Sequence, residues 1–146
     1  MKNFLWEKII NLISIITFRI IPKKLIEFGM VGFLGIIIQL IFFYLFNSFN
    51  KNNFLSNNLI ALLIGTISGY CLNNFITFKN KELKGKKFIL GMFKFLIFSL
   101  ITITINICVS LLVFNLLKVK IIAIFSGIIC GFLSNYFISR KLVWNV

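Results

Sequence analysis

Four long stretches without a charged residue dominate this sequence of 146 residues. They cover 28–50, 52–78, 95–117 and 121–139, and they contain 23, 27, 23 and 19 residues. About 20 apolar residues are enough to span a bilayer as a helix, whereas one charge at the centre of such a helix costs ~2.5 to 3.5 kcal/mol. The stretches therefore predict an all-α integral membrane protein with spans over 28–46, 58–77, 94–116 and 121–139.

Composition excludes most soluble enzymes. The chain is 60% hydrophobic and only 13% charged, whereas soluble domains are about 25% charged. It has no His and only three acids, Glu7, Glu27 and Glu82. A His-centred triad, a zinc site or a carboxylate-rich metal site cannot be assembled from so few groups, so we expect no catalysis, no metal and no cofactor. Each of the three cysteines lies in an apolar run and is assigned to packing: Cys71, Cys108 and Cys130.

The positive charges predict how the spans are oriented. Thirteen of the 16 cations fall before the first span, between the second and third, or after the fourth. The other three are Lys51, in a first loop over 47–58, and Lys118 and Lys120, in a tight third turn. By the positive-inside rule, both termini of this multi-pass protein lie on the cytoplasmic side of the cell membrane. Cations dispersed along membrane edges form no single basic face, so nucleic acid is not an expected partner.

The first 22 residues are apolar enough to be compared with a signal peptide, but no cleavage pattern of small residues follows Pro22. Four polar residues fall instead on one narrow helical face: Asn3, Glu7, Asn11 and Ser14. We predict that 1–22 forms an amphipathic helix in the cytoplasmic interface, with Trp6 at headgroup depth and Lys8 and Arg19 near its polar edge. Pro22 would break this helix before the transmembrane domain over 23–146.

An internal repeat predicts the architecture. Residues of the second span match residues of the fourth at a constant offset of 62: Ala61, Gly65, Gly69, Asn73, Phe75, Ile76 and Thr77 match Ala123, Gly127, Gly131, Asn135, Phe137, Ile138 and Ser139. The first and third spans match more weakly at an offset of 67, which pairs Gln39 with Asn106 and Glu27 with Lys94. The protein therefore consists of two copies of a helical hairpin, and because each copy has two spans, the copies are parallel repeats.

Small residues share one face of each even-numbered span, at a spacing of four. Such faces allow close helix packing, and we expect them to pack between hairpins or between protomers rather than against a ligand. They are Ala61, Gly65, Gly69, Ala123, Gly127 and Gly131.

Four carboxamide side chains form two polar layers inside the spans. Lys79 and Arg140 mark the cytoplasmic edge of the second and fourth spans. At 1.5 Å per residue, Asn73 lies ~9 Å inside Lys79 and Asn135 lies ~7 Å inside Arg140. Gln39 and Asn106 lie ~18 Å inside the charged residues that precede their spans. Polar groups at such depth face a bundle interior or a wet cavity. Interhelical hydrogen bonds, worth ~0.6 kcal/mol each, and a place in a substrate path are both compatible with this pattern.

Three segments together carry a family resemblance. Residues 27–32 read Glu-Phe-Gly-Met-Val-Gly, residues 73–78 read Asn-Asn-Phe-Ile-Thr-Phe, and Asn135-Tyr136 is followed by Arg140 and by Leu-Val-Trp at 142–144. In this order and spacing, 25–144 resembles the GtrA-like family of small four-span membrane proteins associated with cell-surface polysaccharide synthesis. Three positions depart from the family pattern: Glu27 replaces a basic residue, Ile76 replaces Trp, and Gln39 stands where many members carry Asp.

The resemblance implies a function. Family members are thought to flip, or help to flip, polyprenyl-phosphate-linked monosaccharides across the membrane, usually beside a glycosyltransferase. Cations at headgroup level would hold the substrate phosphate: Lys94, Arg140 and Lys141. Carboxamides further in would bind sugar hydroxyls: Asn73, Asn135, Asn106 and Gln39. Because Glu27 cannot bind phosphate, Lys94 becomes the better candidate for the boundary cation.

Translocation is one of several functions that a small membrane protein of this kind can have. The chain could instead be an accessory or scaffold subunit that holds a glycosyltransferase at anionic lipid, with the basic central loop in contact with lipid. A cation efflux pump is excluded, because it needs a carboxylate deep in the first span and Glu27 lies at its edge. Four spans are few for a closed pathway, which makes a homo-oligomer a reasonable expectation.

Overall fold

The structure, a computed structural model, describes residues 4–17, 20–49 and 53–146. Its five α-helices are α1 (Phe4–Ile16), α2 (Lys23–Phe49), α3 (Phe54–Leu72), α4 (Lys86–Leu117) and α5 (Lys120–Ile138). A wide π-helical turn, η1 (Asn73–Thr77), continues α3 and is followed by a 3₁₀ turn, η2 (Lys79–Lys81); a second π-helical turn, η3 (Ser139–Val143), continues α5. Four of these helical stretches are long and apolar enough to cross a membrane, so the predicted all-α fold with four spans is confirmed.

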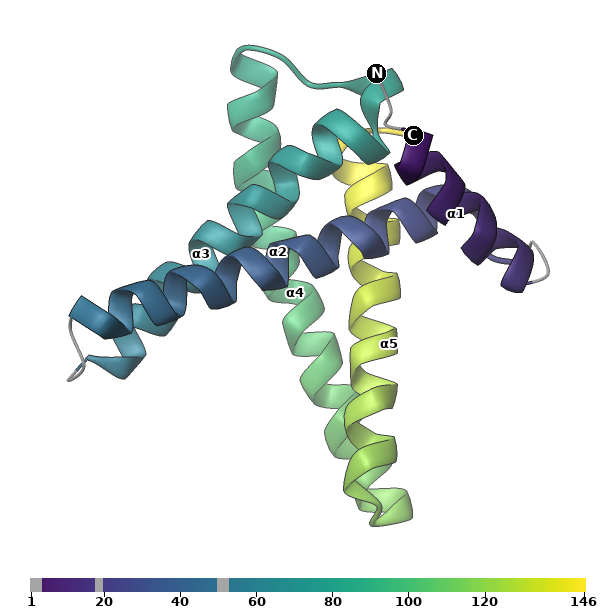
Figure 1. The fold of residues 1–146 in the computed structure, drawn as a ribbon. Helices are drawn as coiled ribbons and strands as arrows, with labels where there is room; N and C mark the ends of the chain where they lie inside the picture. Colours follow the sequence, from purple (N-terminus) through teal and green to yellow (C-terminus); the bar gives the residue numbers. More distant parts are fainter. Residues whose placement is uncertain (1–3, 18–19, 50–52) are drawn as a thin grey trace. The chain divides into compact units, whose positions relative to one another are not determined.

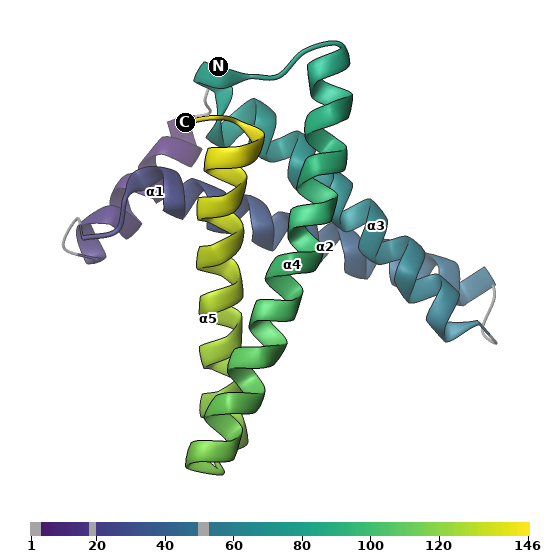
Figure 2. The same ribbon diagram turned by 180° about the vertical axis from the view of Figure 1, so that it is seen from behind.

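The chain divides into two compact units, 1–82 and 83–146. Each unit contains one helical hairpin: α2 runs alongside α3 in the first, and α4 runs alongside α5 in the second (Figures 1 and 2). The two hairpins correspond to the two copies of the sequence repeat.

The helices extend beyond the charge-free stretches from which they were predicted. Helix α4 begins at Lys86, eight residues before the predicted start, and α2 begins at Lys23, five residues before it. Hydropathy detects only the part of a helix that is surrounded by lipid tails, whereas the helix itself continues into the headgroup region with its lysines. The first loop is correspondingly shorter than predicted, since α2 ends at Phe49 and α3 begins at Phe54.

The tight turn between α4 and α5 was predicted correctly. Lys118 adopts a left-handed conformation, with φ of 57°, and its N–H donates to the Phe114 carbonyl over 2.9 Å. This geometry caps the C-terminus of α4 by satisfying a carbonyl that has no partner within the helix.

Pro22 does not end the N-terminal helix as predicted. Helix α1 already ends at Ile16, where the Thr17 hydroxyl donates to the Ile13 carbonyl over 3.0 Å. Pro22 instead precedes α2, and its carbonyl accepts a hydrogen bond from the Ile26 N–H. Proline fits the start of a helix because its missing N–H would have no helical partner there.

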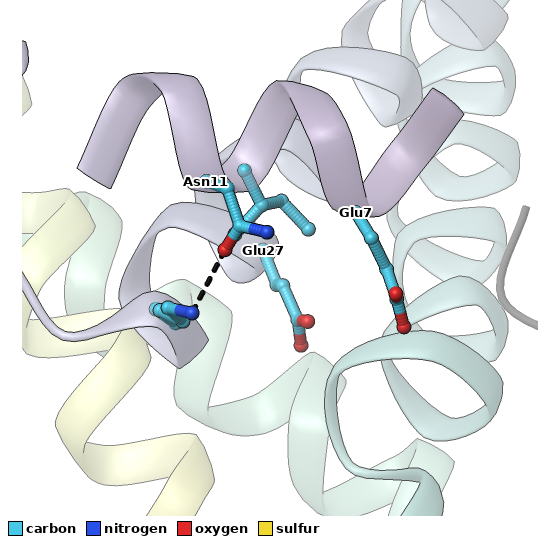
Figure 3. Close-up of a pocket in the computed structure, with 5 residues that line it drawn as sticks. Glu7, Asn11 and Glu27 are labelled. Atoms are coloured by element: carbon cyan, nitrogen blue, oxygen red, sulfur yellow. Dashed lines mark hydrogen bonds between the residues drawn. The ribbon is translucent and has the colours of Figure 1, made fainter. Parts of the chain in front are cut away.

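The polar face of α1 is turned toward α2. Glu7 and Asn11 line a cavity beside α2, and the Lys23 ammonium donates to Asn11 Oδ1 over 2.8 Å (Figure 3). Ser14, on the same face, is buried. Most of the large apolar side chains of α1 are exposed, whereas Ile10 is buried; the exposed ones are Leu5, Ile9, Leu12, Ile15 and Ile16. This arrangement suits an amphipathic helix whose apolar face meets lipid, and its interfacial position stays a prediction; Asn3, Arg19 and Lys51 lie outside the described residues.

In the first unit, α2 and α3 approach closely at glycines. A Cβ atom on Gly65 would lie 2.8 Å from Gln39 Cβ and 2.8 Å from the Gly35 carbonyl oxygen. A Cβ on Gly35 would in turn lie 3.2 Å from the Gly65 carbonyl oxygen. These distances are below normal van der Waals contact, so the two backbones meet where neither residue has a side chain.

The second unit repeats this contact. A Cβ on Gly127 would collide with the Ser110 hydroxyl and lie 2.5 Å from the Asn106 carbonyl oxygen, and a Cβ on Gly131 would lie 2.9 Å from Asn106 Cβ. Gln39 and Asn106, which the sequence repeat pairs, therefore occupy equivalent places at the two helix crossings. The small-residue faces were expected to pack between hairpins or protomers, but these glycines contact the preceding helix of their own hairpin. A short connection already holds the two helices side by side, and the glycines allow them to close.

Each hairpin ends in a buried aromatic pair. Phe28 packs edge-on against Phe78 with ring centroids 6.3 Å apart, and Phe95 packs in the same manner against Trp144 at 5.8 Å. Both closing residues donate their N–H across a π-helical turn, Phe78 to the Asn73 carbonyl and Trp144 to that of Ser139. In the first unit the π-helical turn begins at Asn73 itself, whereas in the second unit it begins four residues after the matching asparagine, Asn135.

The crossing predicts a difference between two glycines of one helix. Gly65→Ala should destabilise the protein by ~1 to 3 kcal/mol, because the added methyl group overpacks the contact with Gln39 and Gly35. Gly69→Ala is the matched control, since a Cβ there meets nothing within 4 Å. That variant should be neutral or slightly stabilising, as Ala has the higher helix propensity. Thermal unfolding in detergent measures both, and equal stabilities would contradict the close contact at Gly65.

Candidate functional site

A hydrogen bond between two buried side chains orients the first predicted site residue, Asn73. It is only 2% exposed and lies at the start of η1. The Thr77 hydroxyl, one helical turn further along the chain and also buried, donates to Asn73 Oδ1 over 2.9 Å. The hydroxyl thereby fixes which way the carboxamide of Asn73 faces.

The second unit contains the same hydrogen bond. The Ser139 hydroxyl donates to Asn135 Oδ1 over 3.2 Å. Asn135 and Ser139 match Asn73 and Thr77 at the repeat offset of 62. The two copies of the repeat therefore share a side-chain hydrogen bond as well as residue types. We call each of these two pairs a hydroxyl–asparagine pair.

The hydroxyl–asparagine pair determines what the asparagine offers to a ligand. A carboxamide has an acceptor oxygen and an NH₂ group with two donors. Because the neighbouring hydroxyl occupies one of the two lone pairs of Oδ1, both donors of the Nδ2 group and one lone pair remain for further partners. Suitable acceptors are sugar hydroxyl oxygens and phosphate oxygens. Both pairs lie near the ends of their spans, close to Lys79 in one hairpin and Arg140 in the other.

The deeper carboxamides lie at the helix crossings. Gln39 Cβ faces Gly65, and Asn106 packs against Gly127 and Gly131. Asn106 Oδ1 also accepts a hydrogen bond from the Ser110 hydroxyl at 3.3 Å. That hydrogen bond lies within α4, so the contact that Gln39 and Asn106 each make with the other helix of their hairpin is packing against glycine.

The three candidate cations line two different cavities of the second unit. Lys94 lines a cavity of about 150 Å³ together with Lys87. Arg140 and Lys141 line another, of about 430 Å³, with Phe137 and Asn145. The Arg140 side chain is partly engaged, because its Nε donates to a main-chain oxygen of Val146 over 2.9 Å.

Glu27, which departs from the family pattern, lies in a third cavity. It is 6% exposed and lines about 270 Å³ of space with Glu7, Asn11 and Lys23. Figure 3 shows Glu27 below α1, with Glu7 and Asn11 extending from α1 toward the same side. The boundary position of the first hairpin therefore contributes to the polar contact between α1 and α2.

Three residues that the structure associates with the candidates were not identified from the sequence. Thr77 and Ser139 were recognised as part of the repeat but not as partners of the asparagines, although a separation of four residues places two side chains on one helical face. Lys87 was missed because α4 was expected to begin only at 94. With the helix extended to Lys86, the separation of seven residues from Lys94 would have indicated a shared face.

Comparison with known proteins places these features in a family. No curated protein matches the chain. The family described as GtrA/DPMS, transmembrane domain, matches residues 27–144 and thus includes both hydroxyl–asparagine pairs, both glycine crossings and Lys94. This match supports a role in polysaccharide synthesis that involves polyprenyl-phosphate sugars. With four-fifths of its length matched and four candidate spans in two hairpins, the chain belongs to the GtrA/DPMS transmembrane-domain family.

Proposed function

We propose that the protein translocates a polyprenyl-phosphate-linked monosaccharide across the cytoplasmic membrane, with both of its termini in the cytoplasm. The observation that carries the proposal is the hydroxyl–asparagine pair, which recurs at the same place in both hairpins of a family linked to these lipids. The translocated sugar would be used to modify a polysaccharide or glycan at the cell surface.

The chemistry of such a substrate matches what the asparagines offer. Its sugar carries several hydroxyl groups, and each would lose hydrogen bonds with water on entering the apolar region, at a cost of a few kcal/mol per unsatisfied group. Uncharged carboxamide donors compensate part of that cost without introducing a charge into the hydrocarbon. Movement of the sugar needs no bond to be made or broken by the protein.

A scaffold function is the second candidate. The large apolar side chains of the spans are mostly exposed, and such faces can meet lipid or the spans of a partner protein. A glycosyltransferase is the partner that the family resemblance implies. Transport by the reconstituted protein alone separates the two candidates, because a scaffold would co-purify with its enzyme but move no lipid-linked sugar.

The asparagines provide the first test. In liposomes containing the purified protein, Asn73→Ala and Asn135→Ala should each slow translocation of a polyprenyl-phosphate hexose more than tenfold, since each removes an oriented donor. In cells, the same variants should lose sugar modification on the outer face without lower membrane levels of the protein. Asn80→Ala is the matched control, because Asn80 is exposed in η2. Wild-type rates in both site variants would overturn the assignment of the asparagines.

The hydroxyl groups provide a finer test. Thr77→Val keeps the shape of the side chain but removes the donor to Asn73 Oδ1, and it should slow translocation roughly fivefold, as expected for one hydrogen bond of ~1 kcal/mol. Thr77→Ser retains the hydroxyl and should restore the rate. A Val variant as active as the Ser variant would show that the orientation of Asn73 does not depend on Thr77.

Orientation can be tested with single cysteines. After replacement of Cys71, Cys108 and Cys130, Lys84→Cys should be protected from a membrane-impermeant thiol reagent in intact cells, because the loop between η2 and α4 is cytoplasmic in the proposed topology. Lys118→Cys, in the turn between α4 and α5, should be labelled. The reverse labelling pattern would place both termini outside.

A further inference from the structure

Two lysines of α4 line a small cavity at one end of the second unit. The cavity measures about 150 Å³, and its lining residues are Leu83, Lys87, Leu90, Gly91, Lys94 and Val143. Lys87 and Lys94 supply the cationic groups, and the rest of the lining is apolar or glycine. The cavity thus combines two positively charged side chains with an apolar lining.

The positions of the lysines allow both to reach one ligand group. Seven residues correspond to nearly two turns of an α-helix, so Lys87 and Lys94 share a face and their Cα atoms are ~10 Å apart along the axis. Gly91 lies between them on that face and presents no side chain. The flexible four-carbon stems let the two ammonium groups converge over Gly91.

The surroundings indicate the chemical class of the ligand. A phosphodiester has two non-bridging oxygens that share one negative charge, and each can accept a charge-assisted hydrogen bond from one ammonium group. Leu83, Leu90 and Val143 would meet the first carbons of an attached hydrocarbon chain. Lys94 directly precedes the long charge-free stretch of α4, which places the cavity at headgroup level, where lipid phosphates lie.

We propose that Lys87 and Lys94 together bind the phosphate group of a lipid phosphodiester in this cavity. The identification of that lipid with the polyprenyl-phosphate-linked sugar rests on the proposed function. The inference adds Lys87, one of the lysines first assigned only to topology, to the binding residues. It also places this phosphate site in a different cavity from the one that Arg140 and Lys141 line.

Direct binding tests the proposal on the full-length protein in maltoside micelles, with a radiolabelled polyprenyl-phosphate hexose as the probe. Lys87→Gln and Lys94→Gln should each weaken binding about tenfold, which corresponds to ~1.4 kcal/mol. Lys87→Arg and Lys94→Arg should retain it, since the charge and donors remain. Lys86→Gln is the matched control, because it removes the same charge from the neighbouring position on α4 but not from the cavity lining.

The outcomes are distinct. If Lys87→Gln and Lys94→Gln bind the probe like Lys86→Gln, the site is overturned, whatever transport assays show. Competition by phosphatidylglycerol distinguishes the two sources of a lipid phosphodiester: equal competition identifies bulk anionic phospholipid as the occupant, and weak competition identifies the sugar-carrying lipid. Both results support the phosphate site if binding depends on the two lysines. Lysine-dependent binding without transport by the wild-type protein would instead refute the proposed function alone.

Discussion

Close backbone contact at glycines is the interaction on which each hairpin depends. Within a bilayer, lipid tails solvate Leu, Ile and Phe side chains as well as another helix does, so apolar burial alone does not hold spans together. Gly65 against Gln39 and Gly127 against Asn106 replace that missing driving force with dense packing and nearby polar groups. Most large apolar side chains are accordingly left exposed, as expected for a protein whose solvent is lipid.

The crossings also determine where the candidate donors lie. Asn73 follows Gly65 by eight residues, and Asn135 follows Gly127 by eight. At 1.5 Å per residue, each hydroxyl–asparagine pair is held ~12 Å along a rigid helix from the point where the two backbones touch. The repeat thus conserves a length as well as residue types. A substitution at Gly65 or Gly127 that pushes the two helices apart would therefore shift the asparagine of the same hairpin, although that asparagine lies about two helical turns from the glycine.

Most of the architecture could be predicted from the sequence because charge is so costly in lipid. The absence of charge located four spans, and the offset of 62 paired the two hairpins. Helix ends were less predictable, since lysines such as Lys86 and Lys87 are excluded from the hydrocarbon but not from a helix. The partner of the glycine face was also misjudged, because spacing shows which residues share a face and not which helix covers it. Thr77 and Ser139 escaped notice as hydrogen-bond donors because a hydroxyl is also an ordinary packing residue in a membrane helix.

Comparison of the two hairpins shows why the proposed phosphate site has no counterpart at the equivalent positions of the first hairpin. The offset of 67 pairs Lys94 with Glu27 and Lys87 with Ile20, so the first hairpin lacks both ammonium groups at the equivalent positions. Glu27 instead lines the cavity against which the polar face of α1 lies. The symmetry of the repeat is therefore present where packing and carboxamide orientation require it, at the glycines and asparagines. It is lost at headgroup level, where the first hairpin contacts the N-terminal helix and the second contains the cavity proposed to bind a lipid phosphate.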